Sequence, residues 1–194
     1  MHDATTLTLV ALAALLCAWG ARRDLRLPIA VTLGGFALAA LSVSAIAGIA
    51  FVPIAALVLA CLLIAETDRR HHLIPDPMTL ALLALALAMP FGDGALVQAF
   101  GGLCLGALFL AIRQICNSWR GGDTLGLGDV KLAGAMGAVL GPTHGLIAVA
   151  VAGVATITVI AIRGRGDAAL AGAPFGIGLA AATAAVALIR VLSP

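Results

Sequence analysis

The segment 47–65 reads AGIAFVPIAALVLACLLIA, and the segment directly after it, 66–77, reads ETDRRHHLIPDP. The first segment has nineteen residues and no charge, so as an α-helix it is about 28 Å long, close to the thickness of a bilayer's hydrocarbon core. The second segment is the most polar stretch of the chain. This abrupt change from an uncharged apolar run to a charged loop predicts a helix that ends at a membrane surface.

The composition of the whole chain supports the same interpretation. Of its 194 residues, 62% are hydrophobic and 10% are charged, against about 25% charged residues in soluble globular domains. So few charges cannot cover a soluble domain of this size, and so much apolar surface excludes an intrinsically disordered chain. The net charge of +2 is too small and too scattered to indicate nucleic-acid binding.

Alternating apolar and polar stretches divide the chain into eight predicted helical segments. One of them, Val130–Leu140, has eleven residues and is about 16 Å long, too short to cross a bilayer alone. It is therefore a half-helix or is lengthened by the loop beside it, and the dipeptide Gly141-Pro142 ends it. The predicted fold is an all-α, polytopic membrane bundle of about eight transmembrane segments, formed by residues 1–194 as a single domain. The segments cover residues 7–20, 28–45, 47–65, 78–89, 95–115, 130–140, 145–162 and 174–192.

The basic residues are sorted by this arrangement. If the loops alternate between the two sides of the membrane, the four polar stretches share one face and hold ten of the eleven Lys and Arg residues; only Arg190 falls on the other face. The positive-inside rule makes the first face cytosolic and places both termini outside. The four stretches are residues 21–27, 66–77, 113–131 and 163–167.

Glycines and cysteines are read as packing residues. Glycines one helical turn apart allow backbones to approach closely, although ordinary helix packing explains each pair equally well.

The cysteines form no CxxC pair, so a zinc or disulfide framework is not expected, and we interpret them as small buried apolar side chains. Neither a metal nor a cofactor is predicted, because the adjacent His71 and His72 point in different directions and have no third ligand nearby. The glycine pairs are Gly102/Gly106, Gly137/Gly141 and Gly172/Gly176, and the cysteines are Cys17, Cys61, Cys104 and Cys116.

Two carboxylates lie beside apolar segments on the same predicted face. Asp68 follows the third segment, and Asp129 precedes the short sixth segment after Gly126-Leu127-Gly128. A carboxylate at a membrane is costly and therefore a functional candidate. Two of them on one face suit general acid–base hydrolysis, in which one takes a proton from water and the other polarises a carbonyl group. Alternatively, Asp68 balances the charges of Arg69 and Arg70, and Asp129 caps a helix.

Three short motifs resemble those of the type IV prepilin peptidases, which are membrane aspartic proteases. The segment Gly126–Leu132, GLGDVKL, resembles the family's GxGD signature. The segment Asp68–Asp76, DRRHHLIPD, resembles its element of an Asp followed by Ile-Pro-Asp, and Ala173–Gly176, APFG, resembles the Pro-Phe-Gly element at its last span. The three motifs occur in the family's order between about residues 50 and 190.

The resemblance implies that Asp68 and Asp129 are the catalytic pair. The matching motifs add supporting residues, among which Lys131 either holds a carboxylate or a substrate carbonyl or is an interfacial lysine that reaches for the membrane surface. Asp76, Glu66 and Asp123 either attract a basic leader peptide or lie in solvated loops. The supporting residues are Gly126, Gly128, Lys131, Pro75 and Asp76.

The implied activity is that of a prepilin leader peptidase in the inner membrane, without a cofactor. Its partners are the lipid bilayer and a prepilin or pseudopilin, from which it removes a short basic leader at the cytosolic interface. Larger family members carry an N-terminal cytosolic insertion with CxxC motifs, associated with methylation of the new N-terminus. Here the loop 21–27 is short and CxxC is absent. The chain therefore resembles the peptidase-only form that serves Flp/Tad-type pili, and we expect no N-methyltransferase activity.

Two other functions fit parts of the pattern. A small proton-coupled transporter could use Asp68, Asp129 and Lys131 as a proton relay, and it could contain a short broken helix. Its acidic residues would then be expected near the membrane midplane, not at one face. A non-catalytic assembly subunit of a pilus or secretion machine leaves the GLGDVK segment unexplained. The sequence leaves the oligomeric state open.

Overall fold

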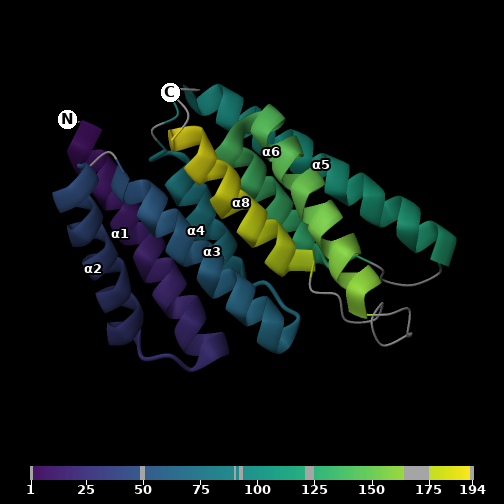
Figure 1. Ribbon diagram of the computed structural model, residues 1–194, viewed down its shortest axis with the longest axis horizontal. Helices are drawn as coiled ribbons and strands as arrows, with labels where there is room; N and C mark the ends of the chain where they lie inside the picture. Colours follow the sequence, from purple (N-terminus) through teal and green to yellow (C-terminus); the bar gives the residue numbers. More distant parts are fainter. Residues whose placement is uncertain are drawn as a thin grey trace.

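The computed structural model describes residues 2–48, 51–89, 91, 94–120, 125–163 and 175–192, and the regular structure in these residues is entirely helical (Figure 1). This confirms the predicted all-α fold. The helices are α1 (His2–Gly20), the π-helical turn η1 (Ala21–Leu25), α2 (Ile29–Ala47), α3 (Val52–His71), α4 (Asp76–Ala86), α5 (Gly94–Arg120), α6 (Leu127–Arg163) and α8 (Phe175–Leu192).

Helix α6 is a hairpin of two helical arms. At Gly141 the backbone has φ 75° and ψ 174°, a conformation outside the helix that glycine adopts without strain, and Pro142 follows it. A Cβ placed on Gly145 would lie 3.5 Å from Cα of Gly137, whereas residues eight apart in a straight helix are separated by about 12 Å. The chain therefore doubles back, which confirms the predicted break at Gly141-Pro142. We call residues 127–140 the first arm and residues 142–163 the second arm.

The predicted count of about eight transmembrane segments is somewhat higher than the described residues show. Among the described residues, four helical stretches are long and apolar enough to cross a bilayer, namely Ala4–Leu25, Gly94–Trp119, Leu127–Ile162 and Phe175–Leu192, and the third of them contains the break at Gly141. Each predicted segment does fall on a helix, but α4 has only eleven residues, or about 16 Å. Helix α3 joins an apolar part to a charged last turn. Hydropathy alone does not separate a complete span from a shorter helix that its neighbours shelter.

Helices α5 and α6 pack through glycines that face one another. A Cβ on Gly102 would lie 3.1 Å from the carbonyl oxygen of Gly134, and a Cβ on Gly106 would lie 3.6 Å from the Gly134 Cα. Gly101 and Gly137 are closer still, since a Cβ on either would overlap the backbone carbonyl of the other. The predicted pair Gly102/Gly106 is therefore a packing contact.

The other two predicted glycine pairs behave differently. Gly137 packs against α5, but Gly141 forms the break of α6. Gly172 lies outside the described residues, and Gly176 lies beside Asp68. Spacing along the sequence therefore identified close backbone approaches without identifying their partners.

We expect Gly137→Ala to destabilise the folded protein, because its methyl group can be accommodated only if α5 and the first arm separate. Such overpacking typically costs about 1–3 kcal/mol. Thermal unfolding in detergent measures the effect. The matched control is Gly153→Ala, where a Cβ meets no atom within 4 Å. Equal melting temperatures for the two variants would contradict the packing described here.

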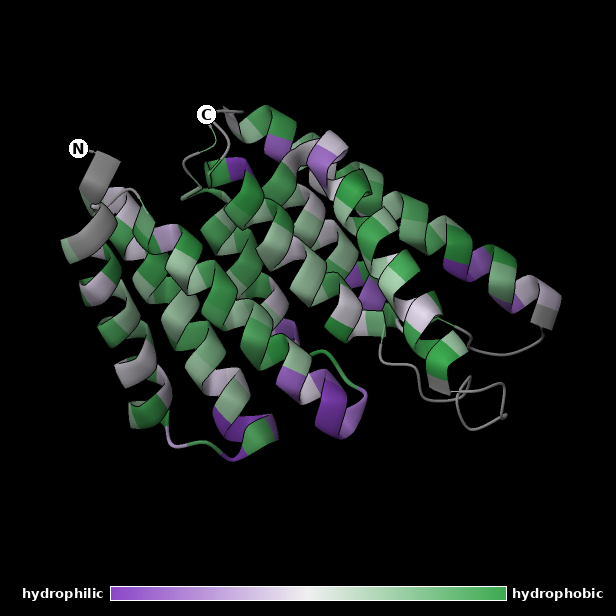
Figure 2. Cartoon of the chain, viewed as in Figure 1, coloured by the Kyte–Doolittle hydropathy of each residue, from purple (hydrophilic) through white to green (hydrophobic). Residues whose placement is uncertain are grey.

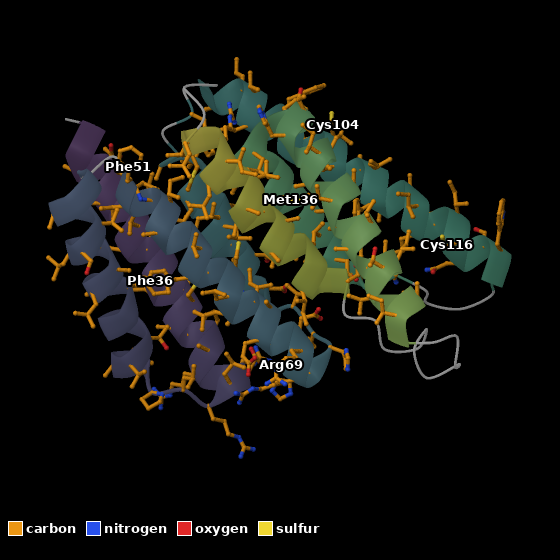
Figure 3. The ribbon with its side chains drawn as sticks, viewed as in Figure 1. Phe36, Phe51, Arg69, Cys104, Cys116 and Met136 are labelled. Carbon is orange, nitrogen blue, oxygen red and sulfur yellow. The ribbon has the colours of Figure 1, made fainter. Side chains whose placement is uncertain are left out.

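The prediction that all four cysteines are buried is half wrong. Cys17 and Cys61 are buried, whereas Cys104 is exposed and Cys116 is half-buried on α5 (Figure 3). Among the described residues α5 packs mainly against α6, with a few contacts to α4 and α8, and the side of α5 that carries Leu96, Leu103 and Cys104 is exposed. In a bilayer that side contacts lipid, for which an apolar cysteine is as suitable as it is for a protein core.

The hydrophilic residues gather mainly at one end of the bundle, where η1, the end of α3 and the beginnings of α4 and α6 meet (Figure 2). Arg190 lies at the other end, as predicted. Its guanidinium carbon is 4.3 Å from the centre of the Phe91 ring, and its Nη1 donates a hydrogen bond of 3.1 Å to the carbonyl of Leu140. Residues from three of the predicted basic stretches, among them Arg23, His72 and Lys131, therefore lie at the polar end; residues 164–174, which include Arg165, lie outside the described part of the chain.

Candidate active site

A cavity of about 500 Å³ opens at the polar end of the bundle. It brings together residues that are far apart in the sequence and come from η1, the end of α3, the loop before α4, and the beginning of α6. Both predicted carboxylates line it. The lining residues are Arg23, Asp24, Asp68, His72, Leu73, Ile74, Pro75, Asp76, Pro77, Gly126, Leu127, Gly128, Asp129 and Lys131.

Asp68 is placed by the last turn of α3 and is almost fully buried, with 6% of its surface exposed. Its Oδ2 accepts a hydrogen bond of 3.0 Å from the backbone N–H of Ile177, in the first turn of α8. The first N–H groups of a helix have no partner within the helix, so a carboxylate there satisfies one of them. Burial raises the pKa of Asp68, while the Ile177 hydrogen bond and the nearby His72 act in the opposite direction.

Gly176 makes room for the Asp68 carboxylate. A Cβ at this position would lie 2.7 Å from Oδ2 of Asp68 and 3.0 Å from Cδ1 of Ile74. The preceding residue, Phe175, stacks on Phe109 of α5 with the ring centres 6.0 Å apart, which fixes the start of α8. The predicted Pro-Phe-Gly element therefore serves Asp68 through its glycine; its first residues, Ala173 and Pro174, lie outside the described part of the chain.

Asp129 is the third residue of α6 and is half-buried. Its carboxylate accepts a hydrogen bond from the backbone N–H of Gly126, and the charge of Asp68 acts on it electrostatically. The alternative of a helix-capping role is thus partly correct, because the carboxylate binds an N–H at the helix start from within the first turn. Asp129 nevertheless lines the same cavity as Asp68, so this local role leaves it available for chemistry.

Ile74 connects the three sequence motifs. It is buried, and it lies between two glycines, since a Cβ on Gly128 would be 3.1 Å from the Ile74 Cβ and a Cβ on Gly176 would touch its Cδ1. Pro75, also buried, precedes the first residue of α4. Ile74 of the Ile-Pro-Asp element therefore lies between the beginnings of α6 and α8 and sets the distance between them. Because Asp129 lies at the beginning of α6 and Asp68 binds the beginning of α8, this distance also sets the position of the two carboxylates.

Lys131 holds the carboxylate of Asp76. The distance from Lys131 Nζ to Asp76 Oδ1 is 2.7 Å, and both side chains are at least half exposed. Of the alternatives for Lys131, binding a carboxylate is therefore correct. The carboxylate that it binds is that of Asp76, which is not one of the two candidate catalytic residues. An exposed ion pair of this kind contributes little stability, about 0–1 kcal/mol.

Glu66 takes the role that was considered for Asp68. Its two oxygens accept hydrogen bonds from Arg69 at 2.8 Å and from Arg70 at 2.5 Å, and these bonds lower the pKa of Glu66 to about 2. Figure 3 shows Arg69 at the polar end of α3. Asp68 is thus not the counter-ion of these arginines, and Glu66 is engaged within its own helix. Asp123 lies outside the described residues.

The sequence did not identify several residues of the site. Arg23 and Asp24 line the cavity from η1, and Arg113 of α5 donates a hydrogen bond to the carbonyl of Leu125 just before the GLGD segment. The only signal in the sequence was that the stretches 21–27 and 113–131 share the polar face. No regular spacing along the sequence links these residues to Asp68, because only the packing of the helices brings them to the polar end.

Comparisons with known proteins agree with this arrangement. Residues 55–192 match the model of the type IV leader peptidase family. The chain is 36% identical over 95 residues to a prepilin leader peptidase/N-methyltransferase of Xanthomonas campestris pv. campestris, an alignment that covers 44% of this chain and 32% of that protein. The chain thus spans about a third of the length of the curated relative it matches, and no solved structure matches it. Because the family model covers well over half of the chain and includes both carboxylates, the protein belongs to the type IV leader peptidase family.

Proposed function

We propose that the protein is a prepilin leader peptidase of the aspartic type. The observation that carries this proposal is that Asp68 and Asp129, sixty-one residues apart in the sequence, line one cavity at the polar end of the bundle. Each carboxylate is positioned by a backbone N–H at the beginning of a different helix. Family membership supports peptidase chemistry, and the paired carboxylates support the aspartic mechanism.

In the proposed mechanism the two carboxyl groups share one proton, because two close negative charges disfavour each other. The ionised carboxylate takes a proton from water while the water oxygen bonds to the carbonyl carbon of the scissile peptide. The protonated carboxyl group gives its proton to the carbonyl oxygen. As the tetrahedral intermediate breaks its C–N bond, the leaving nitrogen receives the first proton. The hydroxyl proton returns to the other carboxylate, which restores the dyad.

The apolar helices and the family indicate a multi-pass protein of the inner membrane. We propose that its polar end faces the cytosol. The Lys and Arg residues of a leader keep it cytosolic while the following apolar helix lies in the bilayer. The scissile bond then arrives at the interface, where water reaches the dyad.

Reporter fusions test this orientation. Fusions at Arg70, Arg120 and Arg165 should report a cytosolic position, and a fusion at Asp93 an external one, because alternating loops would put ten of the eleven basic residues on the first side. Of these four positions, Asp93 and Arg165 lie outside the described residues. An external signal at Arg120 would contradict the orientation.

The direct test of the function is co-expression with a candidate prepilin. We expect a shorter pilin band on a gel when the protein is present, and the unprocessed band when it is absent. Persistence of the unprocessed band with every prepilin-like substrate of the host would contradict a peptidase role.

We also predict that this chain cleaves without methylating. It has no CxxC pair, and its first basic loop, residues 21–27, is short. Mass spectrometry of a pilin processed by this protein alone should show an unmodified N-terminus. A pilin heavier by one methyl group would refute the peptidase-only form, and the methylated product of a relative with the CxxC insertion provides the positive control.

A further inference from the structure

A second cavity, of about 510 Å³, lies between α4, α5 and the first arm of α6. Its walls include Leu80 and Leu83 from α4 and Ala99 and Leu103 from α5. Leu80 and Leu103 are 51% and 73% exposed, so the cavity opens onto the outer surface of the bundle. In a membrane this surface faces lipid.

The second cavity adjoins the candidate active site. Asp76 and Lys131 line both cavities, and the 2.7 Å ion pair between them lies at the junction. On the side of the first cavity the lining includes Asp68 and Asp129. On the side of the second cavity, the lining side chains apart from this ion pair are apolar except for the hydroxyl group of Thr79. A chain that leaves the dyad past this junction therefore passes from a polar environment into an apolar one.

The second cavity follows the helix axes away from the polar end. On α4 it extends from Asp76 to Leu83, and on the first arm from Lys131 to Ala138. Seven residues of a helix correspond to about 10 Å, or two helical turns. Its length therefore matches about two turns of another helix lying alongside.

We propose that this second cavity receives the apolar helix that directly follows the cleavage site of the substrate. The inference rests on the proposed peptidase function and adds the place where the substrate's membrane segment binds. A bond held at the dyad is followed at once by that helix, and the second cavity is a mainly apolar space that shares Asp76 and Lys131 with the candidate active site.

The small residues of the lining favour a helix over a lipid chain as the occupant. Lipid tails are as apolar as leucine, so helices associate in membranes through close packing, which small residues permit. Ala99, Gly102 and Ala135 line the cavity together with the larger Leu83 and Leu103. A helix backbone can approach the small residues while its side chains contact the leucines.

The first experiment fills the cavity with Ala99→Trp and, separately, Leu83→Trp. Each variant is assayed with a full-length substrate in liposomes and with a short peptide that ends a few residues after the scissile bond. We expect the ratio of the two kcat/KM values, full-length over peptide, to fall at least tenfold. Leu62→Trp is the control, since Leu62 is 60% exposed on α3 and does not line the cavity. An unchanged ratio in both cavity variants would overturn the proposal.

The second experiment detects binding without cleavage. A photoreactive residue replaces Leu103 in the Asp129→Asn background, with the same replacement at Leu62 as control. We expect crosslinks to the substrate's apolar helix from position 103 only. Crosslinks from position 103 to lipid alone would overturn the proposal. Failure of the peptidase function itself would appear differently, as a wild-type protein that cleaves neither the full-length substrate nor the peptide.

Discussion

Asp68→Asn and Asp129→Asn should each abolish leader cleavage while leaving the protein folded and inserted. An asparagine side chain has nearly the size of aspartate, but it neither accepts a proton from water nor serves as a comparable acid. Each single replacement therefore removes one half of the proton exchange that the mechanism requires. The helices are held by apolar and glycine contacts elsewhere, so membrane levels measured by blotting should stay near those of the wild type. Processing of a prepilin on a gel measures the effect.

The double variant and a matched control sharpen this prediction. Because the proposed mechanism uses the two carboxyl groups as one unit, the double variant should lose no more activity than either single variant. Glu66→Gln is the control, since it makes the same carboxylate-to-amide change two residues from Asp68 but alters only the contacts with Arg69 and Arg70. It should keep near-normal cleavage. Near-normal cleavage by either Asp68→Asn or Asp129→Asn would exclude the aspartic dyad and favour a transporter or an assembly subunit.

Gly176→Ala should reduce cleavage at least tenfold, although it adds a single methyl group. The new Cβ would lie 2.7 Å from Oδ2 of Asp68 and 3.0 Å from Cδ1 of Ile74. The carboxylate must then move, which breaks its hydrogen bond to the N–H of Ile177 and changes its position relative to Asp129. A misplacement of about 1 Å at reacting groups can cost about a hundredfold in rate. Initial rates of prepilin processing measure the loss.

Gly178→Ala is the matched control for this prediction. It makes the same change two residues further along α8, where the nearest atom to a new Cβ is the hydroxyl oxygen of Thr156, at 3.1 Å, on the second arm of α6. A hydroxyl can rotate away, so we expect a rate within about threefold of the wild type. Wild-type activity in Gly176→Ala would show that the position of the Asp68 carboxylate does not control cleavage.

The sequence by itself determined the features that depend on local composition. Uncharged apolar runs predicted helices, and Gly141-Pro142 predicted the break in α6, because glycine is flexible and a proline inside a helix removes a backbone hydrogen bond and clashes with the preceding turn. The concentration of basic residues in a few loops predicted that Asp68 and Asp129 share one end of the bundle. The three motifs then indicated that Asp68 and Asp129 are the carboxylates to test.

Only the tertiary structure decided which groups touch. The Asp68 carboxylate binds the N–H of Ile177, 109 residues away, and Ile74 separates Gly128 from Gly176. Glu66, not Asp68, binds the two arginines, because a carboxylate at the buried face of α3 is turned away from them. Composition describes a helix along its length, whereas burial and contact depend on the face that a neighbouring helix covers.

The same reason explains the predictions that were wrong and the features that were missed. Cys104 is exposed because α6 covers only one face of α5, and α4 is too short for a span but is sheltered by α1 and α6. The second cavity exists only where α4, α5 and the first arm meet. Apolar residues that face lipid and those that face protein have the same composition in a membrane, so the arrangement of the helices alone distinguishes them.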